Sequence, residues 1–275
     1  MKISFQGAKG AYSDQACREL YPDAQTLPCQ SFEDAFEAVI KGEADLAVIP
    51  IDNTLAGRVA DVHHLLPTSG LHIIGEHFLS INHCLMAPKG ATLESLTHVH
   101  SHVHALPQCR KFIRNHGLTP VIHADTAGSA AEIADRNDPT QGAIASALAA
   151  EIYGLQILER GIQDDESNKT RFIILSPTAQ TFDIQDDVIT SFVFEVRNIP
   201  AALYKTLGGF ATNGVNMIKL ESYVDDQFNA ARFYCEILGH TREEAVCLAM
   251  EELGFYAKNI VILGSYPKSP LRDKF

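Results

Sequence analysis

Short apolar segments alternate with amphipathic segments over the first 176 residues, and this alternation limits the fold more than any other feature of the sequence. The apolar segments have the length of buried strands, and the segments between them repeat apolar residues at the spacing of one helix face. The alternation predicts α/β units with mostly parallel strands. Strands are expected at residues 2–5, 46–50, 72–85, 97–101, 120–123, 142–145, 155–158 and 170–175. Helices are expected at residues 14–20, 32–41, 59–66, 108–116, 129–136 and 147–153.

This pattern ends at a polar stretch, residues 176–187, and then starts again in a shorter form. The stretch contains Pro177 and three aspartates, which is typical of a linker. Beyond it the sequence predicts a strand, a helix, a hairpin turning at Asp225, a helix with Thr241 as N-cap, and a last strand. The order βαββαβ is that of a ferredoxin-like domain. A length of 275 residues fits about two domains, and a single very large barrel is the competing interpretation.

The charge and composition exclude several classes of protein. Hydrophobic residues make up 46% of the chain, enough for a core, and this argues against disorder. The formal charge of −12 disfavours nucleic acid or anionic lipid as the main partner, and no apolar run approaches the roughly 20 residues of a membrane span. No signal-peptide segment follows Met1, and none of the six cysteines forms a CxxC pair. We therefore expect a cytoplasmic protein with reduced thiols.

Two polar segments follow predicted strands and are candidates for ligand binding. Residues 7–13 match neither a P-loop nor a dinucleotide fingerprint, but the helix that they begin could hold a carboxylate at its N-terminus. Asp52-Asn53-Thr54 follows a continuous apolar strand, at the edge where open α/β sheets bind ligands. Ordinary turn formation explains both segments as well.

Four alternating histidines, at positions 98, 100, 102 and 104, share one face of a predicted strand. Such a row could bind a metal, but no carboxylate or thiolate lies at ligand spacing nearby, and exposed histidines without a metal are the favoured interpretation. Ser101-His102 followed by Gln108-Cys109 then reads as a polar strand end that leads into a helix.

Asn168-Lys169-Thr170-Arg171-Phe172 is the most informative segment, because it places a hydroxyl beside a cation at the start of an apolar strand. Arginine suits bidentate binding of a carboxylate. A plain polar strand edge is the alternative.

Together, and in this order, these motifs resemble those of the prephenate dehydratase family over residues 2 to about 175. Ile199-Pro200-Ala201-Ala202-Leu203 and Leu220-Glu221-Ser222 resemble the ACT regulatory domain that follows in that family. The resemblance implies an α/β fold: a two-lobed, periplasmic-binding-protein-like catalytic domain at 1–177, then a ferredoxin-like βαββαβ ACT domain at 188–267. Lobe one is expected at 1–77 plus 163–176, and lobe two at 78–162.

The resemblance also implies the activity, which is the decarboxylating dehydration of prephenate to phenylpyruvate in L-phenylalanine biosynthesis, without a metal or an organic cofactor. Thr170 is expected to donate a hydrogen bond or proton to the leaving hydroxyl, and Arg171 to stabilise charge or hold a carboxylate. The neutral hydrogen bonds are expected from Asn53, Ser101 and Gln108. Supporting positions are Asp52, Thr54, Phe172 and His102.

In the ACT domain the resemblance implies inhibition by L-phenylalanine at a pairing interface, in a homodimer or homotetramer. The expected effector residues are Pro200, Ala201, Leu203, Asn213, Asn216, Leu220, Glu221 and Ser222. Three motifs depart from the family pattern. Asp52 replaces a glutamate, Ala201 replaces the glycine of Gly-Ala-Leu, and Tyr223-Val224 replaces Arg-Pro.

Three other functions are compatible with parts of the sequence. Arogenate dehydratase performs the same chemistry on the amino-acid analogue of prephenate. A non-catalytic two-lobed sensor shares the lobe architecture, and a purely regulatory ACT protein shares the second domain. Thr170-Arg171-Phe172 favours an enzyme over the sensor, and the resemblance of the first 176 residues to a catalytic domain disfavours a purely regulatory protein.

Overall fold

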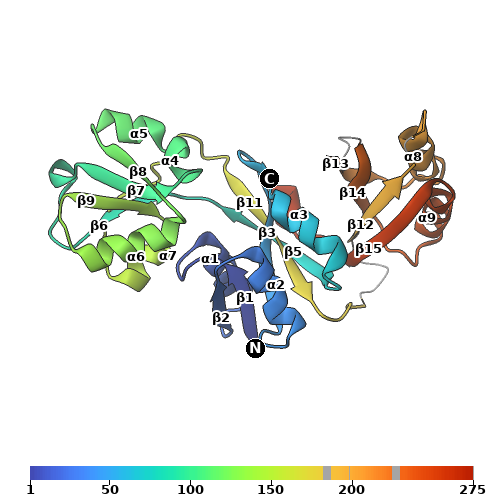
Figure 1. Ribbon diagram of the computed structural model, residues 1–275, viewed down its shortest axis with the longest axis horizontal. Coiled ribbons are helices and arrows are strands. Elements are labelled where there is room, and N and C mark those ends of the chain that lie inside the picture. The colour runs from blue at the N-terminus through green and yellow to red at the C-terminus, as the bar shows by residue number, and fades with distance from the viewer. Residues whose placement is uncertain (182–186, 198, 225–229, 275) are drawn as a thin grey trace. The chain divides into compact units, whose positions relative to one another are not determined.

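The computed structural model describes residues 1–181, 187–197, 199–224 and 230–274 of the chain (Figure 1). The predicted hairpin turn at Asp225, and Asp183 and Asp186 of the predicted linker, lie outside the described residues. The chain divides into two compact units, residues 1–59 with 77–172 and residues 60–76 with 173–275. The predicted domain limits, 1–177 and 188–267, stay a prediction.

The first sheet has the strand order β2-β1-β3-β11-β5, with the short strand β4 paired to β3 (Figure 1). Strand β1 pairs in parallel with both β2 and β3, whereas β4 is antiparallel to β3. The strands are β1 (Lys2–Gln6), β2 (Gln25–Cys29), β3 (Leu46–Asn53), β4 (Gly57–Arg58), β5 (His72–Ser80) and β11 (Lys169–Ser176), and the helices between them are α1 (Tyr12–Leu20), α2 (Phe32–Ile40) and α3 (Ala60–Leu65), with the 3-10 turn η1 (Leu66–Thr68).

The second sheet has the order β10-β6-β9-β7-β8 and is mixed: β7 is parallel to β8 and β9, and β6 is antiparallel to β9 and β10. Its core contains Leu85, Val99, Cys109 and Ile144. The two-lobed α/β architecture is confirmed. The elements are β6 (Cys84–Ala87), η2 (Leu93–Ser95), β7 (His98–His102), α4 (Ala105–Gln108), α5 (Arg110–Asn115), β8 (Thr119–His123), α6 (Thr126–Arg136), β9 (Gln141–Ala145), α7 (Ala147–Tyr153) and β10 (Gln156–Arg160).

Local side-chain chemistry sets several helix ends. Ser31 accepts a hydrogen bond from the Asp34 amide at the start of α2, and Asp34 bonds back to the Ser31 amide in a capping box. Ser146 caps α7 in the same position, and that helix ends at Gly154, whose φ of +69° suits a residue without a Cβ. These ends fix where the loops between helices and strands begin.

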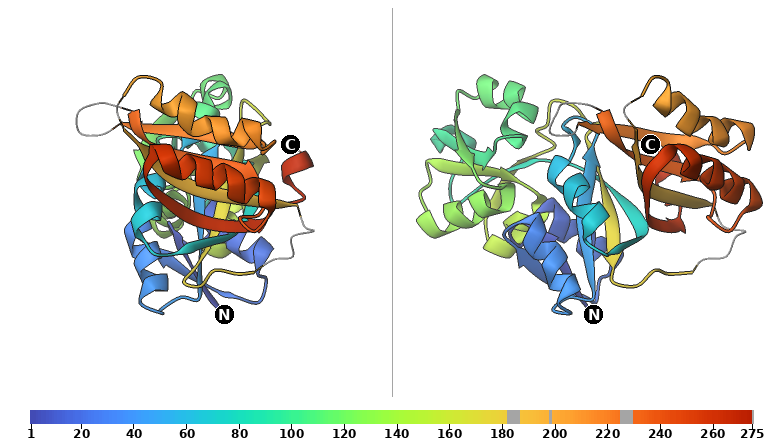
Figure 2. Two further views of the ribbon diagram at one scale, coloured as in Figure 1. Left: turned by 90° about the vertical axis from the view of Figure 1, so that its right-hand side faces the viewer. Right: turned by 45° about the vertical axis from the view of Figure 1, so that its right-hand side comes forward.

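In the second unit an antiparallel sheet, β13-β14-β12-β15, carries both of its helices on one face (Figure 2). Phe192, Phe194, Phe210 and Leu253 pack between the sheet and the helices. The predicted βαββαβ order is confirmed. The elements are β12 (Val188–Val196), α8 (Ala202–Thr212), β13 (Met217–Val224), β14 (Ala230–Leu238), α9 (Glu244–Tyr256), β15 (Ala257–Pro267) and the 3-10 turn η3 (Arg272–Lys274).

The predicted cap of the last helix is wrong. Helix α9 begins at Glu244, not directly after Thr241, and Glu243 at its N-cap position makes no side-chain cap bond to the helix. The Glu243 carboxylate instead accepts from the His240 amide at 2.6 Å and closes a turn ahead of the helix. A local turn has therefore displaced the helix start by two residues.

Residues 60–76 belong to the same unit as the C-terminal sheet and contact it closely. The Tyr223 hydroxyl lies 2.5 Å from His63 Nδ1. Glu76 accepts two hydrogen bonds from the Arg272 guanidinium, at 2.9 and 2.6 Å. A Cβ on Gly264 would lie 2.1 Å from the Ile73 carbonyl oxygen, so only glycine allows this close backbone approach.

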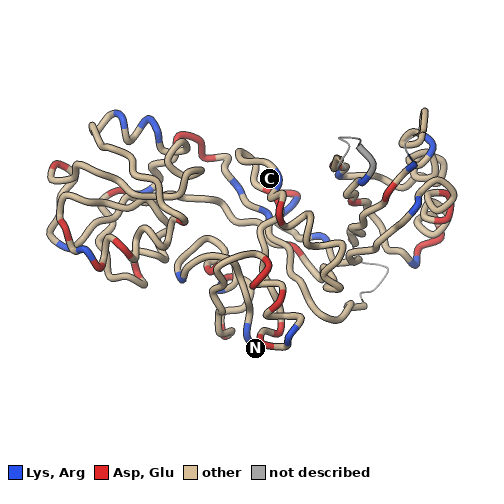
Figure 3. The backbone as a smooth tube through the Cα atoms, viewed as in Figure 1, with Lys and Arg blue, Asp and Glu red and all other residues tan. Residues whose placement is uncertain are grey.

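Charged residues occur along the whole chain and do not gather in one part of it (Figure 3). In the described part of the chain, no helix combines the length and apolar character that crossing a membrane needs.

Candidate active site

Asn53, the last residue of β3, has both ends of its side-chain amide engaged. Its Oδ1 accepts from the backbone amides of Leu55 at 3.0 Å and Ala56 at 2.8 Å. Its Nδ2 donates to Asn168 Oδ1 at 2.8 Å and to Thr170 Oγ1 at 2.9 Å. Because the Thr170 oxygen accepts this bond, the Thr170 hydroxyl keeps its own proton for another acceptor.

The hydrogen bonds continue from Asn168 to the end of α4, to the residue before β6 and to the start of α1. Asn168 Nδ2 donates to Gln108 Oε1 at 2.8 Å, and His83 Nε2 lies 2.9 Å from the same oxygen. His83 Nδ1 in turn lies 2.8 Å from the Tyr12 hydroxyl. Burial lowers the pKa of His83, so its ring is neutral. We call these six residues, Tyr12, His83, Gln108, Asn168, Asn53 and Thr170, the hydrogen-bond chain.

A cavity of about 250 Å³ lies against this chain of residues. Five predicted site residues line it, namely Asn53, His102, Gln108, Thr170 and Phe172. The remaining lining residues are Tyr12, Ser13, Pro50, Ala56, Val59, Ile81, His83, His104, Ala105, Thr126 and Asn168. A small, largely apolar cavity with a few fixed polar groups is the usual form of a small-molecule site.

Two helices begin beside the cavity. Tyr12 and Ser13 lie in the first turn of α1, whose N-cap residue Ala11 makes no side-chain cap bond, whereas α6, which begins at Thr126, is capped by the Asp125 side chain, which accepts from the Gly128 amide. Free amides at a helix N-terminus bind anions. No Lys or Arg occurs among the described residues that line this cavity.

Arg171 and Asp52 do not line the cavity. Successive strand residues face opposite sides, so Thr170 and Phe172 face the cavity and Arg171 does not. Arg171 Nη1 lies 3.5 Å from Asp52 Oδ2, and the arginine side chain is only 6% exposed. The pair therefore joins the ends of β3 and β11 behind the polar groups that face the cavity.

Ser101 and Thr54 also lie outside the cavity lining. Ser101 is fully buried, and its hydroxyl donates to the Ile144 carbonyl at 2.6 Å. Thr54 Oγ1 donates to the Ser167 carbonyl at 3.1 Å and accepts from the Lys169 amide at 2.9 Å. Both hydroxyls connect backbone segments, and neither is presented to a ligand by this cavity.

Three members of the hydrogen-bond chain were missed as site residues in the sequence, namely Tyr12, His83 and Asn168. A signal existed for two of them. Asn168 lies two positions before Thr170, so strand alternation places both on one side. His83 is a polar residue in an apolar run that was predicted to be a single strand, and such a residue is expected to be hydrogen-bonded.

The histidine row is divided between different surroundings. His100 is buried and lies 2.8 Å from Gln141 Oε1, whereas His102 and His104 line the cavity. Burial, followed by the nearby charge of His104, lowers the pKa of His102. In the described residues, no group of three or more His, Cys, Asp or Glu side chains could hold a metal ion.

A second cavity, of about 510 Å³, lies at the start of α8 in the C-terminal unit. It brings together four of the predicted effector residues, Ala201, Leu203, Leu220 and Ser222. Arg197 also lines it and is the one cation among its described lining residues. The other lining residues are Val196, Ile199, Ala202, Tyr204 and Phe233.

Four other predicted effector residues are not part of this lining. Glu221 alternates with Leu220 and Ser222 on β13 and therefore faces the opposite side. Asn213 donates to the Gly209 carbonyl at 2.8 Å and to Glu252 Oε1 at 2.9 Å, which fixes the end of α8. Pro200 and Asn216 are also absent from the lining.

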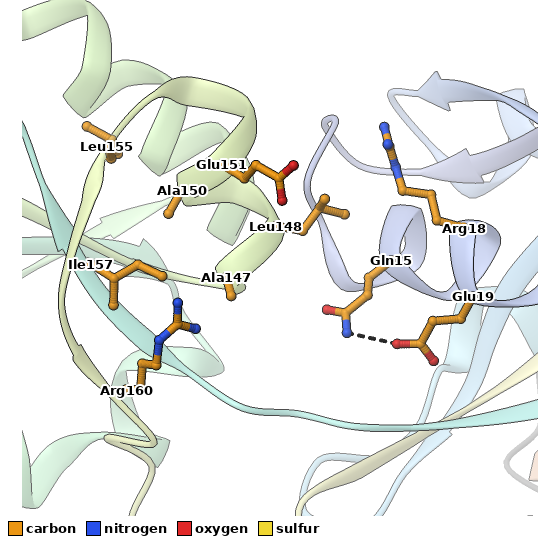
Figure 4. A pocket seen from close by; sticks show the side chains of 10 residues that line it. All are labelled: Gln15, Arg18, Glu19, Ala147, Leu148, Ala150, Glu151, Leu155, Ile157 and Arg160. Atoms are coloured by element: carbon orange, nitrogen blue, oxygen red, sulfur yellow. Dashed lines mark hydrogen bonds between the residues drawn. The ribbon is translucent and has the colours of Figure 1, made fainter. Parts of the chain in front are cut away.

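A wider cavity, of about 740 Å³, lies between α1 and the segment formed by α7 and β10 (Figure 4). Its charged side chains include Arg18, Glu19, Glu151 and Arg160. Arg18 forms an ion pair with Asp14 at 3.2 Å, and Gln15 donates to Glu19, the bond drawn in Figure 4. None of the predicted site residues lines this cavity.

Comparison with known proteins agrees with the motifs and the fold. The family model described as prephenate dehydratase matches residues 3–180. A bifunctional N-acyl-homoserine lactone acylase/prephenate dehydratase of Komagataeibacter europaeus is 46% identical over 99% of this chain and 98% of its own length. Arogenate dehydratase 2 of Petunia hybrida is 36% identical over 97% of this chain and 72% of its own length.

A solved structure, that of the prephenate dehydratase of Arthrobacter aurescens in complex with L-Phe, superposes with a TM-score of 0.89 at 29% identity. The alignment covers 98% of this chain and 90% of that one. The matched family model, the relatives and the shared fold lead to one conclusion: the chain belongs to the prephenate dehydratase family.

Proposed function

We propose that the chain converts prephenate to phenylpyruvate, with loss of carbon dioxide and water. The observation that carries the proposal is the Thr170 hydroxyl, which accepts from Asn53 and keeps its own proton to donate toward a further oxygen. In the reaction the electron pair of the bond to the ring carboxylate enters the ring, and the ring C–O bond breaks. The departing hydroxide takes up a proton and leaves as water.

Thr170 assists this departure by hydrogen bonding to the leaving oxygen. A threonine hydroxyl is a weak acid, so its contribution comes from position and from the Asn53 amide, which polarises it. A donor aimed at an oxygen that gains negative charge stabilises the transition state more than the ground state. Phe172 and Ile81 supply apolar surface for the ring.

Neutral donors would hold the two carboxylates of the substrate. The first turn of α1, whose amides have no side-chain cap, and the side chains of Gln108 and His102 line the same cavity as Thr170. In this proposal Arg171, Asp52, Ser101 and Thr54 support the site from outside the cavity.

Two other activities are tested in the same experiment. Arogenate differs from prephenate by an amino group, and the 46% identical relative is also named for acylase activity on N-acyl-homoserine lactones. The purified chain should form phenylpyruvate from prephenate faster than it forms phenylalanine from arogenate or releases homoserine lactone. Turnover of only one of the other two compounds would reassign the reaction.

We further propose that residues 188–267 form an ACT domain that binds L-phenylalanine and pairs with a second copy of the chain. The cavity at α8 supports this proposal, since Arg197 and the N-terminal amides of the helix suit a carboxylate. Ile199, Leu203 and Phe233 suit a phenyl ring. The proposed catalytic domain is residues 1–177, in a cytoplasmic protein whose six cysteines are free thiols.

The effector proposal is tested by titrating L-phenylalanine into the assay and into a calorimeter. We expect binding and inhibition, both weakened at least tenfold in Arg197→Ala. Sedimentation of the full chain should give a homodimer or homotetramer. Absence of binding at millimolar L-phenylalanine would contradict the effector role and leave the dehydratase proposal standing.

A further inference from the structure

The direction of every hydrogen bond next to Thr170 is set from the backbone. Two backbone amides point at Asn53 Oδ1, and a backbone amide can only donate. The Asn53 side chain must therefore donate through Nδ2, to Asn168 Oδ1 and to Thr170 Oγ1. Reversal of the Asn53 side-chain amide would place its NH₂ group against the backbone N–H groups of Leu55 and Ala56, and two donors cannot form a hydrogen bond.

The same direction then continues to the other end of the hydrogen-bond chain. Asn168 uses its Oδ1 for Asn53, so its Nδ2 donates to Gln108 Oε1. That oxygen can only accept, and His83 Nε2, 2.9 Å away, therefore carries the ring proton. The Tyr12 hydroxyl lies 2.8 Å from Nδ1 and 3.0 Å from the Asn82 carbonyl, so it can satisfy either state of that nitrogen.

We propose that His83 and Asn168 are positioning residues, which act through Gln108 and Asn53 to keep the Thr170 hydroxyl as a donor to the reacting oxygen. This inference rests on the proposed dehydratase function. A histidine N–H at one end and backbone amides at the other hold the two intervening amides in a single orientation. The Gln108 oxygen is used by two donors, so only its NH₂ group remains for substrate.

The role of Asn168 predicts a split between kcat and KM. Asn168→Ala removes the bonds to Asn53 and Gln108, and Asn53 can then divert its donor away from Thr170. We expect kcat to fall at least about tenfold with KM within about threefold, since each hydrogen bond lost from a buried network can change a rate by up to about tenfold. Asn115→Ala, an exposed position at the end of α5, is the matched control.

A double-mutant cycle distinguishes positioning from general support of the fold. If Asn168 acts through Thr170, then Asn168→Ala should change kcat by less than about twofold in a Thr170→Ala background. An equal loss of kcat in both backgrounds would overturn the proposal, because it would show that Asn168 acts independently of Thr170.

Two substitutions of His83 test whether its N–H donor, and not merely its bulk, supports turnover. A glutamine side chain can place an N–H donor near the position of His83 Nε2, whereas leucine has none. We expect His83→Gln to retain at least about ten times the kcat of His83→Leu, with similar melting temperatures for the two variants. Equal kcat values in the two variants would overturn the proposal.

The last measurement does not depend on activity. Long-range ¹H–¹⁵N NMR spectra of the wild-type chain report which ring nitrogen of His83 is protonated. We expect the proton on Nε2 throughout the range in which the ring is neutral. A neutral ring protonated on Nδ1 would overturn the proposal even if the chain is an active dehydratase. The Nε2 result in a chain without dehydratase activity would support the fixed direction and reject the reaction.

Discussion

The cluster at Thr170 and the cluster at Arg272 are both buried polar networks, but only the second is ionic. Neutral amides and hydroxyls make up the described bonds around Thr170. Around Arg272, the guanidinium contacts two fully buried carboxylates, Glu76 at 2.6 Å and Glu236 at 3.4 Å. Glu236 also accepts from the Tyr234 hydroxyl at 2.5 Å.

The difference indicates what each network contributes. A buried ion pair holds its partners strongly in place, because separation leaves an uncompensated charge. A neutral network avoids both repulsion of a dianionic ligand and a competing internal ion pair, and its bond directions can be set by the backbone. We therefore expect changes at Thr170 to affect turnover and changes at Arg272 to affect stability.

The largest expected effect is that of Thr170→Ala on turnover. Loss of a donor aimed at developing negative charge typically lowers kcat by about 10²–10³-fold. The melting temperature should stay close to that of the wild type, since alanine leaves no buried charge. Steady-state kinetics and thermal unfolding measure the two effects.

Thr119→Ala, an exposed position on β8, should change neither quantity. If Thr170→Ala retains near wild-type kcat, then the neutral network around Thr170 does not serve turnover, and Thr170 is not a donor in the reaction.

Arg272→Ala should have the next largest effect, on stability. The substitution removes the guanidinium that contacts the buried Glu76 and Glu236 carboxylates, and breaking a buried pair in this way costs about 3–5 kcal/mol. Urea unfolding followed by tyrosine fluorescence measures the loss. Below the unfolding transition, kcat should stay within about twofold of wild type.

The control is Lys258→Ala, which breaks an exposed pair with Glu195 at 3.2 Å. Such pairs contribute at most about 1 kcal/mol. A similar loss of stability in both variants would show that burial does not distinguish the Arg272 network from an ordinary surface pair.

Sequence reasoning could predict the architecture of both units because alternation and helix spacing carry that information. The βαββαβ order beyond residue 188 was predicted from strand alternation, a turn and a helix pattern, and the structure has the same order. The site residues Thr170, Asn53 and Arg171 came from the resemblance to the family, which implied that Arg171 stabilises charge or holds a carboxylate, whereas in the structure Arg171 does not line the cavity that Thr170 faces. Adjacent residues on a strand cannot both face one cavity, and the stated alternation rule was enough to separate Thr170 from Arg171.

The rest of the site depends on contacts between distant segments. Gln108 and Asn168 are 60 positions apart and Asn53 and Thr170 are 117 apart, so no local pattern reveals that they bond. Arg197 lay beside the predicted effector segment and was passed over, because its exposure to the cavity depends on how β12 meets α8. Which side chain donates and which accepts in such a network can be assigned only when all of its hydrogen-bond partners are known.

A smaller effect is expected on the pH dependence of substrate binding, because protonation of His102 would add a positive charge to a cavity otherwise lined by neutral side chains. Burial, then His104, lowers the pKa of His102, so His102 is neutral at pH 7–8 in the free enzyme. A bound dianion favours the protonated ring. KM should therefore fall about three- to tenfold as the pH drops from 8 to 5.5.

In His102→Asn this dependence should flatten, because asparagine does not titrate. The measurement is KM across this pH range, with the non-enzymatic reaction of prephenate subtracted. An unchanged pH profile in the variant would assign the dependence to another group, and His104 is the first to examine since it lines the same cavity.

The smallest predicted effect concerns a position where the backbone itself, not a polar network, is unfavourable. Ala201 has φ +61° and ψ 17°, in the left-handed region, directly before α8. This conformation costs a non-glycine residue about 1–2 kcal/mol, whereas glycine adopts it readily. Glycine also loses more chain entropy on folding, by about 0.4–1 kcal/mol. Ala201→Gly should therefore stabilise the C-terminal unit by about 0.5–1 kcal/mol.

Ala202→Gly is the matched control, because Ala202 is the first residue of α8 and is not among the residues with positive φ. Without strain to relieve, the entropy of glycine should destabilise the unit by about 0.5–1 kcal/mol. Urea unfolding of the two variants should thus give shifts of opposite sign at adjacent positions. Destabilisation in both variants would mean that Ala201 does not hold the left-handed conformation in solution. The start of α8, which lines the proposed effector cavity, would then be built differently from the backbone described above.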